Sequence, residues 1–221
     1  MKLSLRKFLK KYETHRIDVA VSFLEKGNNL LDVGCADSLL IFKAREKFNK
    51  LYGIDIDANN IKKAQDFALK NSCSDQCEFS VVDANKKMDF EDNFFDCVTI
   101  IGVISNLNNP FAVMKEVKRI IKKDGVLIIH VGNLAYIKHR IRLLLGQLPM
   151  TSAPYNFENW ENLGWDRGVL HYFTHSTIKW LLELNGFKIE KMSNSGLFAK
   201  LRSWWPSLLC GDIILKARNI K

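Results

Sequence analysis

Short apolar runs alternate with segments of helical periodicity along most of the chain. The apolar runs are bounded by Asp, Asn and Gly, which is the pattern of buried strands. The segments between them place apolar residues three or four positions apart, as amphipathic helices do. The predicted strands are 30–33, 51–56, 78–82, 94–101, 126–131, 187–192 and 211–217. Helices are predicted at 14–26, 39–48 and 134–145. Three more helices are predicted to begin at 57–60, at 109–110 and at 174–176, and the last of these ends at Gly186.

This order of elements predicts the fold class. Strands that alternate with helices form a parallel sheet with helices on both faces, because each parallel crossover needs a covering helix. We therefore predict an α/β fold with a Rossmann-like, doubly wound, seven-stranded and mostly parallel sheet. In such a sheet, ligands bind at the carboxyl ends of the strands.

The chain is expected to form a single domain over residues 1–221, because its length and apolar share suit one core. Residues 1–28 are a predicted helical lead-in, and residues 176–221 hold the last helix and strands. Residues 135–175 are predicted to form a flap or substrate-side insertion. Its aromatic residues are Tyr155, Phe157, Trp160 and Trp165. The alternative interpretation is a surface excursion held down by these aromatic side chains.

Composition narrows the class of protein. An apolar share of 47% favours a globular enzyme-sized fold. The sequence has no apolar run long enough for a membrane span and no secretory signal, and five scattered cysteines favour reduced thiols in a cytoplasmic protein. Cys73 and Cys77 have no second pair, so no metal site is expected. The net charge of +9 is interpreted as a solvated surface, since no nucleic-acid motif accompanies it.

The stretch 29–38 reads as a strand, a tight turn and a helix start. The missing side chain of Gly34 lets a ligand approach the backbone amides of this turn. Asp55 follows Gly34 by 21 positions at the end of the second strand, where a carboxylate is placed to bind ribose hydroxyls. Asp83 ends the third strand in the same way. The alternatives are an ordinary strand-to-helix connection for the turn and a helix or turn cap for Asp83.

The turn and the carboxylate after it resemble motif I and the acidic motif of class I S-adenosylmethionine (SAM)-dependent methyltransferases. These enzymes usually carry G-x-G-x-G, whereas this chain has Ala36 and Ser38 at the two later positions, and a Cβ at Ala36 narrows the ligand space. Residues 94–101 are similar to the F-D-x-V strand of the superfamily. The resemblance implies SAM as the cofactor and an antiparallel last strand.

The resemblance also implies a role for each candidate cofactor residue. Gly34, Cys35 and Ala36 would line the cofactor with their backbone, and Asp32 would hold the loop or the cationic amino group. Asp55 and Ile56 would lie at the ribose, and Asp83 and Ala84 at the adenine. Ile101 and Gly102 would lie beside the methionyl end.

The second half of the chain resembles a narrower branch, the MetW-like or methyltransferase type 11 proteins. The resemblance rests on residues 131–133, on an R-x-x-L-L-L-x-G-x-x-P type segment ending at Pro149, and on the segment 168–174. Some members of the branch are associated with methionine biosynthesis and a partner acyltransferase. The branch therefore implies an alternative function, a SAM-binding regulatory subunit with a protein partner.

The predicted activity is methyl transfer from SAM to a small-molecule, glycan or lipid-linked acceptor, with O-methylation favoured. An acceptor hydroxyl must lose its proton, and His171 is the preferred general base over His130, because the branch resemblance includes it. Two other hypotheses stay open. One is a membrane-surface enzyme, suggested by the basic helix at 140–145 and by residues 200–206. The other is a Rossmann dehydrogenase, which the missing glycines disfavour.

Overall fold

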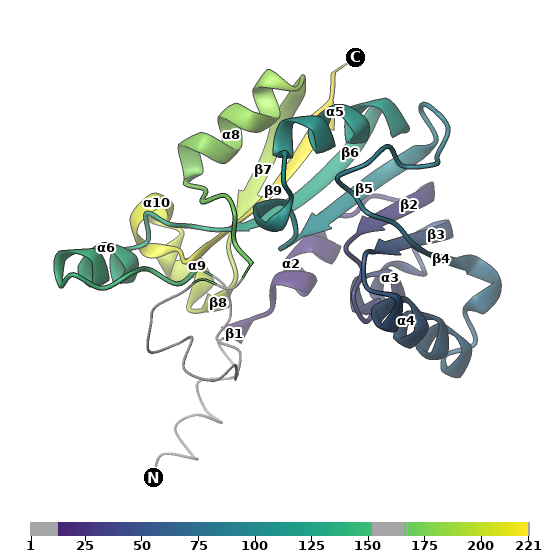
Figure 1. Cartoon of the computed structure of the whole chain (residues 1–221), viewed down its shortest axis with the longest axis horizontal. Coiled ribbons are helices and arrows are strands. Elements are labelled where there is room, and N and C mark those ends of the chain that lie inside the picture. Colours follow the sequence, from purple (N-terminus) through teal and green to yellow (C-terminus); the bar gives the residue numbers. More distant parts are fainter. Residues whose placement is uncertain (1–12, 152–165, 167, 221) are drawn as a thin grey trace, which may run out of the picture.

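A computed structural model describes residues 13–151, 166 and 168–220. Its centre is a seven-stranded sheet in the order β4-β3-β2-β5-β6-β9-β7 (Figure 1). Neighbouring strands from β4 to β6 are parallel, and β9 runs antiparallel to both β6 and β7. The strands are β2 (Gly27–Val33), β3 (Phe48–Asp55), β4 (Cys77–Val81), β5 (Phe95–Ile101), β6 (Ile121–Gly132), β7 (Phe187–Ser193) and β9 (Asp212–Asn219). The predicted sheet and its antiparallel last strand are confirmed.

Helices cover both faces of this sheet. The helices are α2 (Arg16–Phe23), α3 (Leu39–Ala44), α4 (Ala58–Lys70), α5 (Pro110–Ile120), α6 (Ile137–Leu144), α8 (His175–Leu184), α9 (Ala199–Arg202) and α10 (Pro206–Leu209), with short 3-10 turns at η1 (Ser74–Gln76) and η2 (Ile104–Asn106). Helices α5 and α8 pack on one face, and α2, α3 and α4 pack on the other. A small antiparallel pair, β1 (Glu13–Thr14) with β8 (Gly196–Leu197), lies outside the main sheet.

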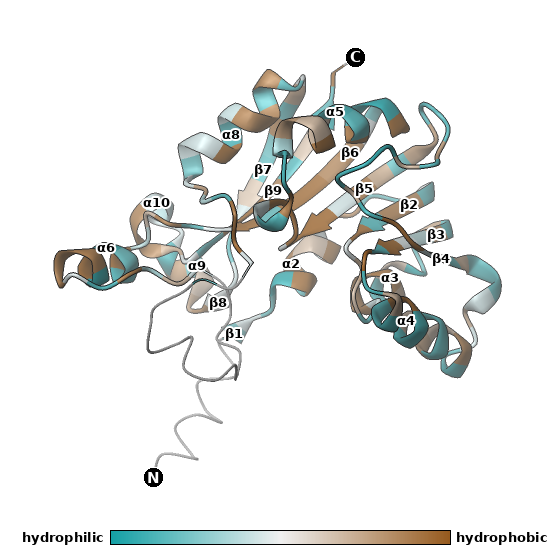
Figure 2. Cartoon of the chain, in the orientation of Figure 1, coloured by the Kyte–Doolittle hydropathy of each residue, from teal (hydrophilic) through white to brown (hydrophobic). Residues whose placement is uncertain are grey.

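The apolar cores follow from the alternation of side chains along each strand. In β2, Leu30 packs in the core under α2 and α3, whereas the next residue, Leu31, packs in the core under α5 and α8. Both leucines are fully buried. Because the central strands β5 and β6 are buried on both faces, long stretches of them are apolar, and they are brown along much of their length in Figure 2.

Two predicted helices are shorter in the structure. The helix predicted at 14–26 spans only Arg16–Phe23, and Gly27, a residue type that predicts the end of this helix, is the first residue of β2. The helix predicted at 39–48 ends at Ala44, because Phe48 already begins β3. In both places two polar residues, Asn28 and Asn29 in β2 and Asn49 and Lys50 in β3, separate the first residue of the strand from its apolar run.

Three predicted positions of residues are wrong. The helical period of the α4 segment predicts that Leu69 faces inward, but Leu69 is 71% exposed. The period of the α5 segment predicts that Phe111 belongs to the apolar stripe, but Phe111 is 42% exposed. The turn residues Asp124 and Gly125 predict the end of the α5 helix, but that helix stops at Ile120, and Asp124 lies within β6 with a positive φ of 60°.

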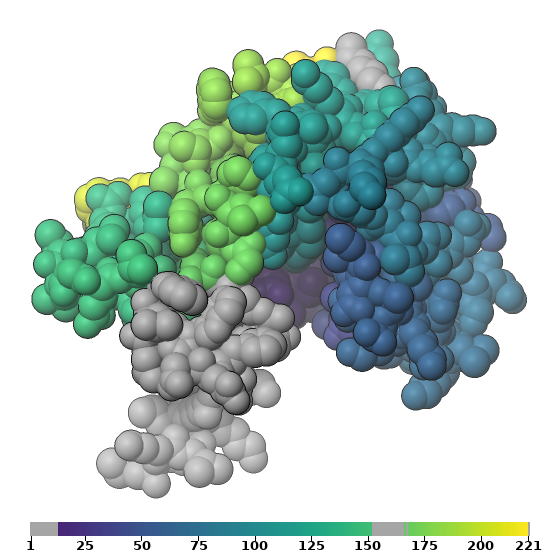
Figure 3. Space-filling model, viewed as in Figure 1, coloured from purple at the N-terminus to yellow at the C-terminus, as the bar shows by residue number. Residues whose placement is uncertain are grey.

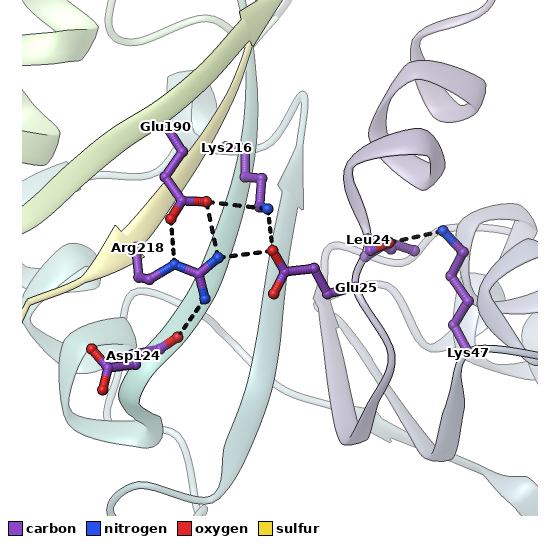
Figure 4. Close-up of polar contacts among 7 residues, drawn as sticks. All are labelled: Leu24, Glu25, Lys47, Asp124, Glu190, Lys216 and Arg218. Carbon is purple, nitrogen blue, oxygen red and sulfur yellow. Dashed lines mark hydrogen bonds and ion pairs between the residues drawn. The ribbon is translucent and has the colours of Figure 1, made fainter.

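A network of charged side chains joins β7 and β9 at the edge of the sheet opposite the carboxyl ends of the parallel strands (Figure 4). Arg218 Nη2 donates to Glu190 Oε2 at 3.0 Å and to Glu25 Oε1 at 2.8 Å. Lys216 Nζ lies 3.1 Å from Glu190 Oε2 and also contacts Glu25. The hydrogen bond from Arg218 is the first of the causes that lower the pKa of Glu190 to about 2. The network fastens β7 and β9 to the segment that follows α2.

Parts of the predicted lead-in and flap lie outside the described residues, including the four flap aromatics Tyr155, Phe157, Trp160 and Trp165. The basic helix expected at 134–145 is present as α6, from Ile137 to Leu144. Among the described residues, no helix combines the length and the apolar character that crossing a bilayer requires.

Candidate functional site

The turn after β2 fits only a glycine at its first position. Gly34 has φ +74°, and a Cβ there would lie 2.2 Å from Val103 Cγ2. The backbone N–H groups of Gly34 and Cys35 both donate to the carbonyl oxygen of Ile54, at 2.7 and 3.0 Å. The turn is therefore pressed between the end of β3 and the segment that follows β5.

The two later motif positions keep a glycine-like backbone although they carry side chains. Ala36 has φ 47° and Ser38 has φ 60°, both in the left-handed region that residues with a Cβ adopt at a cost. The N–H of Ala36 donates to Asp55 Oδ2 at 3.0 Å. The departure from the usual glycines therefore leaves the shape of the turn intact and adds local strain.

Asp55 joins this turn to the end of β3. In addition to Ala36, it accepts hydrogen bonds from the N–H of Asp57 at 2.9 Å and from Asn60 Nδ2 at 3.3 Å, both at Oδ1. An ionised carboxylate has about four acceptor positions, so three protein donors leave capacity for a ligand hydroxyl.

Asp83 is held by its own loop. Its Oδ1 accepts from the backbone N–H and from the side-chain amide of Asn85, at 3.0 and 2.9 Å. The backbone hydrogen bond from Asn85 is the main cause that lowers the pKa of Asp83, so this carboxyl is ionised near neutral pH. No described residue donates to its second oxygen, Oδ2. Asn85 Oδ1 in turn accepts from the N–H of Asn108 at 2.6 Å, which ties this loop to the start of α5.

A cavity of about 250 Å³ lies at the carboxyl ends of β2, β3 and β4. It brings together five of the sequence-predicted residues, namely Gly34, Asp55, Ile56, Asp83 and Ala84. The other lining residues are Ile54, Val82, Asn85, Val103, Asn106 and Leu107. Figure 3 shows the surface hollowed between the blue α4 region and the green segment after residue 168. Two carboxylates on an otherwise mostly apolar lining suit a ligand with hydroxyl or amino groups on flat apolar rings.

Asp32 lies behind this cavity and does not line it. Its carboxylate is buried and accepts a hydrogen bond from Thr99 Oγ1 at 2.6 Å, across the β2–β5 pair. Burial, with smaller contributions from the nearby charges of Asp55 and Asp37, raises the pKa of Asp32 to about 7 against the opposing hydrogen bond from Thr99. The predicted contact of Asp32 with the loop or with a cationic ligand stays a prediction.

Cys35 and Ala36 also stay outside the cavity lining. The side chain of Cys35 is buried against β3, where its Sγ lies 2.9 Å from the position that a Cβ on Gly53 would take. Burial raises the pKa of this thiol, which is therefore protonated. Cys35 supports the turn from below as a small apolar side chain.

Gly102 lies beside a buried histidine. Gly102 has φ +76°, its N–H donates to the carbonyl oxygen of His130, and a Cβ there would lie 3.7 Å from His130 Nδ1. His130 Nε2 lies 3.3 Å from Asp212 Oδ2. Burial acts to raise the pKa of Asp212, but hydrogen bonds from His130 and Ser195 outweigh it and lower this pKa. An ionised Asp212 accepts a hydrogen bond from Nε2–H of His130, and this bond orients the imidazole ring.

His130 Nδ1 is buried and finds no hydrogen-bond partner among the described residues. Ile101 precedes Gly102 at the end of β5 and packs against the α2 side of the sheet. The structure thus places the predicted methionyl-end residues, Ile101 and Gly102, next to a His–Asp pair. No pattern in the sequence predicts this pair, because Asp212 comes from the antiparallel strand β9 and follows His130 by 82 positions.

His171 lies in a separate groove. Its Nε2 is 3.2 Å from the carbonyl oxygen of Asn108, and its backbone N–H donates to the carbonyl oxygen of Ser105 at 3.0 Å. The groove has a volume of about 410 Å³ and is lined mainly by α5, α8 and the segment between residues 170 and 173. Its role as a general base stays a prediction, and the structure does not bring it to the cavity of Gly34 and Asp55.

Sequence reasoning missed the residues that close the cavity on the side of β5. Val103, Asn106 and Leu107 belong to or flank the 3-10 turn η2, and Asn85 follows Asp83. Their only signal in the sequence is that they follow strands at their carboxyl ends.

Comparisons with known proteins find relatives in both sequence and structure. A family model described as a methyltransferase domain matches residues 24–185. The ubiquinone/menaquinone biosynthesis C-methyltransferase UbiE of Pseudomonas putida is 31% identical over 121 residues, which is 52% of this chain. The match spans 45% of that relative, so the chain covers less than half of its length.

Solved structures show the same fold at low sequence identity. A chain from the complex of the Haloferax volcanii Trm112 methyltransferase activator with a methyltransferase aligns with a TM-score of 0.69 at 14% identity, over 97% of this chain and 93% of that one. A SAM-dependent methyltransferase from Aquifex aeolicus aligns with a TM-score of 0.63 at 17% identity, over 98% and 97%. These likenesses confirm the predicted fold class.

Proposed function

Because the chain belongs to the methyltransferase domain family, we propose that it transfers a methyl group from SAM to a small-molecule acceptor. The observation that carries the proposal is the convergence of Gly34, Asp55 and Asp83 on one cavity at the carboxyl ends of neighbouring parallel strands. This edge is where open α/β sheets bind nucleotide-like ligands.

The lining of the cavity fits a nucleoside. Asp55 keeps acceptor capacity for ribose hydroxyls, and Asp83 Oδ2 is free of described protein donors and can accept from an adenine amino group. Leu107 and Val82 offer apolar surface to a base. Gly34 lines the cavity, and its missing side chain leaves room for Val103, which lines the cavity beside it.

The lining residues that would hold SAM are Asp55 and Ile56 at the ribose, Asp83 and Ala84 at the adenine, and Gly34 on the turn. Cys35 and Ala36, which lie outside the lining, would contribute through the backbone of the same turn. Ile101 and Gly102 would lie at the methionyl end, with Asp32 buried behind them as a counter-charge to a cation. SAM supplies a sulfonium-activated methyl group, so the protein contributes mainly position and the exclusion of water.

The acceptor is proposed to carry an ionisable hydroxyl, as a phenol or hydroquinone does. The UbiE relative is named a C-methyltransferase of quinone biosynthesis. Removing a proton from a ring hydroxyl activates the oxygen for O-methylation and the ring carbon for C-methylation, so both reactions need a proton acceptor. His130 Nδ1, which lies beside Gly102, is the group that the geometry favours for this role.

A second candidate function is a SAM-binding regulatory subunit, as the narrower MetW-like resemblance implies. The structural neighbour from Haloferax volcanii is described in a complex with an activator protein, which supports the idea that such a fold works with a partner. Methyl transfer by the purified chain alone would exclude an exclusively regulatory role.

Calorimetry tests the proposal directly. The purified chain is titrated with SAM, with its demethylated product S-adenosylhomocysteine and with NAD, and acceptors are then screened with SAM that carries a labelled methyl group. We expect both sulfur ligands to bind and NAD to give no heat, because a dinucleotide needs the two later glycines. The absence of SAM binding at millimolar concentration, or preferential binding of NAD, would overturn the proposal.

A further inference from the structure

Three short helices form a lobe that projects from one end of the sheet, at the left of Figure 1. The lobe consists of α6, α9 and α10 with the residues that flank them, 133–151 and 196–211. Asn133 Nδ2 donates to the carbonyl oxygens of Ser207 at 3.1 Å and Cys210 at 2.8 Å. Two segments that lie far apart in the sequence are thus fastened into one projecting unit, called the α6/α10 lobe below.

Large apolar side chains are exposed on this lobe. Leu144 is 85% exposed and Trp204 is 82% exposed, although both are residue types that proteins usually bury. The other exposed large apolar residues of the lobe are Ile141, Leu143, Leu145, Leu148, Phe198, Leu201 and Trp205. Such a gathering exceeds the scattered single apolar residues of an ordinary surface and indicates an interaction site.

The charge of the lobe has one sign. Residues 133–151 and 196–211 contain five cations, Lys138, Arg140, Arg142, Lys200 and Arg202, and neither segment contains Asp or Glu. Of the described carboxylates next to the lobe, Asp212 pairs with His130 and Asp166 accepts hydrogen bonds from Thr151, whereas Glu13, which pairs with Leu197 across β1 and β8, is exposed.

We propose that the α6/α10 lobe docks on the surface of a bilayer that contains anionic phospholipid. Exposed leucines next to Lys and Arg are the composition of segments that lie in the membrane interface, and tryptophan side chains favour the headgroup level. The basic residues of the lobe are attracted to anionic headgroups. A protein partner would have to place carboxylates opposite each of these residues, whereas a lipid surface supplies mobile negative charge everywhere. The docking is peripheral and leaves the cavity of Gly34 and Asp55 free.

The test is sedimentation of the full chain with vesicles. Vesicles of neutral phosphatidylcholine are compared with vesicles that also contain anionic phosphatidylglycerol, at low and at high salt. We expect about 10-fold stronger binding to the anionic vesicles, weakened by salt. The double variant Leu144→Glu, Leu145→Glu and the single variant Trp204→Ser are expected to lose most of this binding, the double variant by about 10-fold or more.

The matched control is Leu69→Glu on α4, which changes an equally exposed leucine (71%) far from the lobe. This control should bind vesicles like the parent chain, and all variants should keep the circular dichroism of the parent. Parent protein that ignores anionic vesicles, or a Leu144→Glu, Leu145→Glu variant that still binds them, would overturn the proposal. Sedimentation velocity tests the alternative that a second copy of the chain covers the lobe. A dimer that dissociates in the lobe variants, in a chain that does not bind vesicles, would assign the lobe to that second copy.

Vesicle binding needs neither SAM nor an acceptor, so its outcome is distinguishable from that of the methyl-transfer proposal. A chain that binds SAM but no vesicle would refute only the docking proposal, and a chain that binds vesicles but no SAM would refute only the enzymatic one.

Discussion

Asp55 Oδ2 accepts a hydrogen bond from the backbone N–H of Ala36 at 3.0 Å. This bond couples the end of β3 to the turn after β2, and it uses a carboxylate that also lines the cavity. One side chain therefore shapes the motif turn and faces the proposed ribose position, so its replacement should affect cofactor binding by both routes.

The first prediction concerns Asp55→Asn. The amide keeps the volume but loses charge and acceptor capacity, so we expect SAM to bind about 10- to 100-fold more weakly, measured by calorimetry. The matched control is Asp57→Asn, because Asp57 caps α4 through the N–H of Asn59 and asparagine caps helices equally well. Equal affinities of the Asp55 variant and the parent chain would argue against the ribose assignment.

The second prediction concerns the strained backbone at Ala36. A residue with a Cβ in the left-handed region costs about 1 kcal/mol, and a β-branched residue costs more. We expect Ala36→Val to lower the free energy of unfolding by about 1–3 kcal/mol, whereas Ala36→Gly leaves it unchanged or raises it by up to about 1 kcal/mol. Urea denaturation measures both. A valine variant as stable as the parent would show that the turn carries no strain.

The cavity could be predicted in part from the sequence. Gly34, Asp55 and Asp83 each end an apolar run, and a parallel sheet brings such ends to one edge, so the pattern alone placed them together. Val103 and Asn106 could not be predicted, because their place depends on how the segment after β5 folds over Gly34.

The errors have a common physical origin. Leu69 and Phe111 fit the helical period of their segments, yet each lies at the margin of its apolar stripe, and the width of the face that a helix buries depends on its neighbours. The His130–Asp212 pair required the register of the antiparallel strands β6 and β9, which no local pattern encodes.

The third prediction concerns Asp32. Burial raises its pKa to about 7 from an ordinary value of 3.8. Between these values the folded state binds a proton that the unfolded state has lost, so this group makes stability fall as the pH rises from about 4 to about 7. Asp32→Asn keeps an acceptor for Thr99 and removes the ionisation. At pH 8 we expect it to raise the free energy of unfolding by on the order of 2 kcal/mol.

Urea denaturation at pH 5 and pH 8 checks this prediction, since the parent and the variant should differ more at the higher pH. If Asp32 also acts as counter-charge to a cationic ligand, the Asp32→Asn variant should bind SAM more weakly than the parent. The variant would then be more stable but have a lower affinity for SAM. A variant less stable than the parent at pH 8 would show that the carboxylate is better solvated or paired than its burial implies.

The fourth prediction concerns the network in Figure 4. Arg218→Met keeps the aliphatic contact but removes the donors to Glu190, Glu25 and the carbonyl oxygen of Asp124. Because the network is partly exposed, we expect a loss of only about 1–2 kcal/mol in the free energy of unfolding, decreasing at high salt. Glu190 has a pKa lowered to about 2 from an ordinary 4.5, so its ionised form stabilises the folded state fully at pH values above 4.5. This stabilisation is lost as the pH falls towards 2.

Urea denaturation from pH 7 to pH 3 should therefore show a smaller acid-induced loss in the Arg218 variant than in the parent. Lys70→Met serves as the control, since it removes an exposed cation at the end of α4. The network lies at the edge opposite the proposed cofactor cavity, so SAM affinity should stay at the parental value in both variants. A changed affinity in the Arg218 variant would mean that its effect spreads beyond this edge.

The fifth prediction compares the two candidate bases. His130 Nδ1 lies beside Gly102 and is oriented by Asp212, whereas His171 lies in the groove between α5 and α8. His130→Gln keeps a donor for Asp212 and removes the proton acceptor. With an acceptor found in the labelled-methyl screen, we expect kcat to fall by about 100-fold, with SAM affinity unchanged and with loss of the acid limb of the pH–rate profile. His171→Ala in the same assay tests the sequence-based hypothesis. A parental pH–rate profile in the His130 variant, together with a loss of turnover in the His171 variant, would return the role of base to His171.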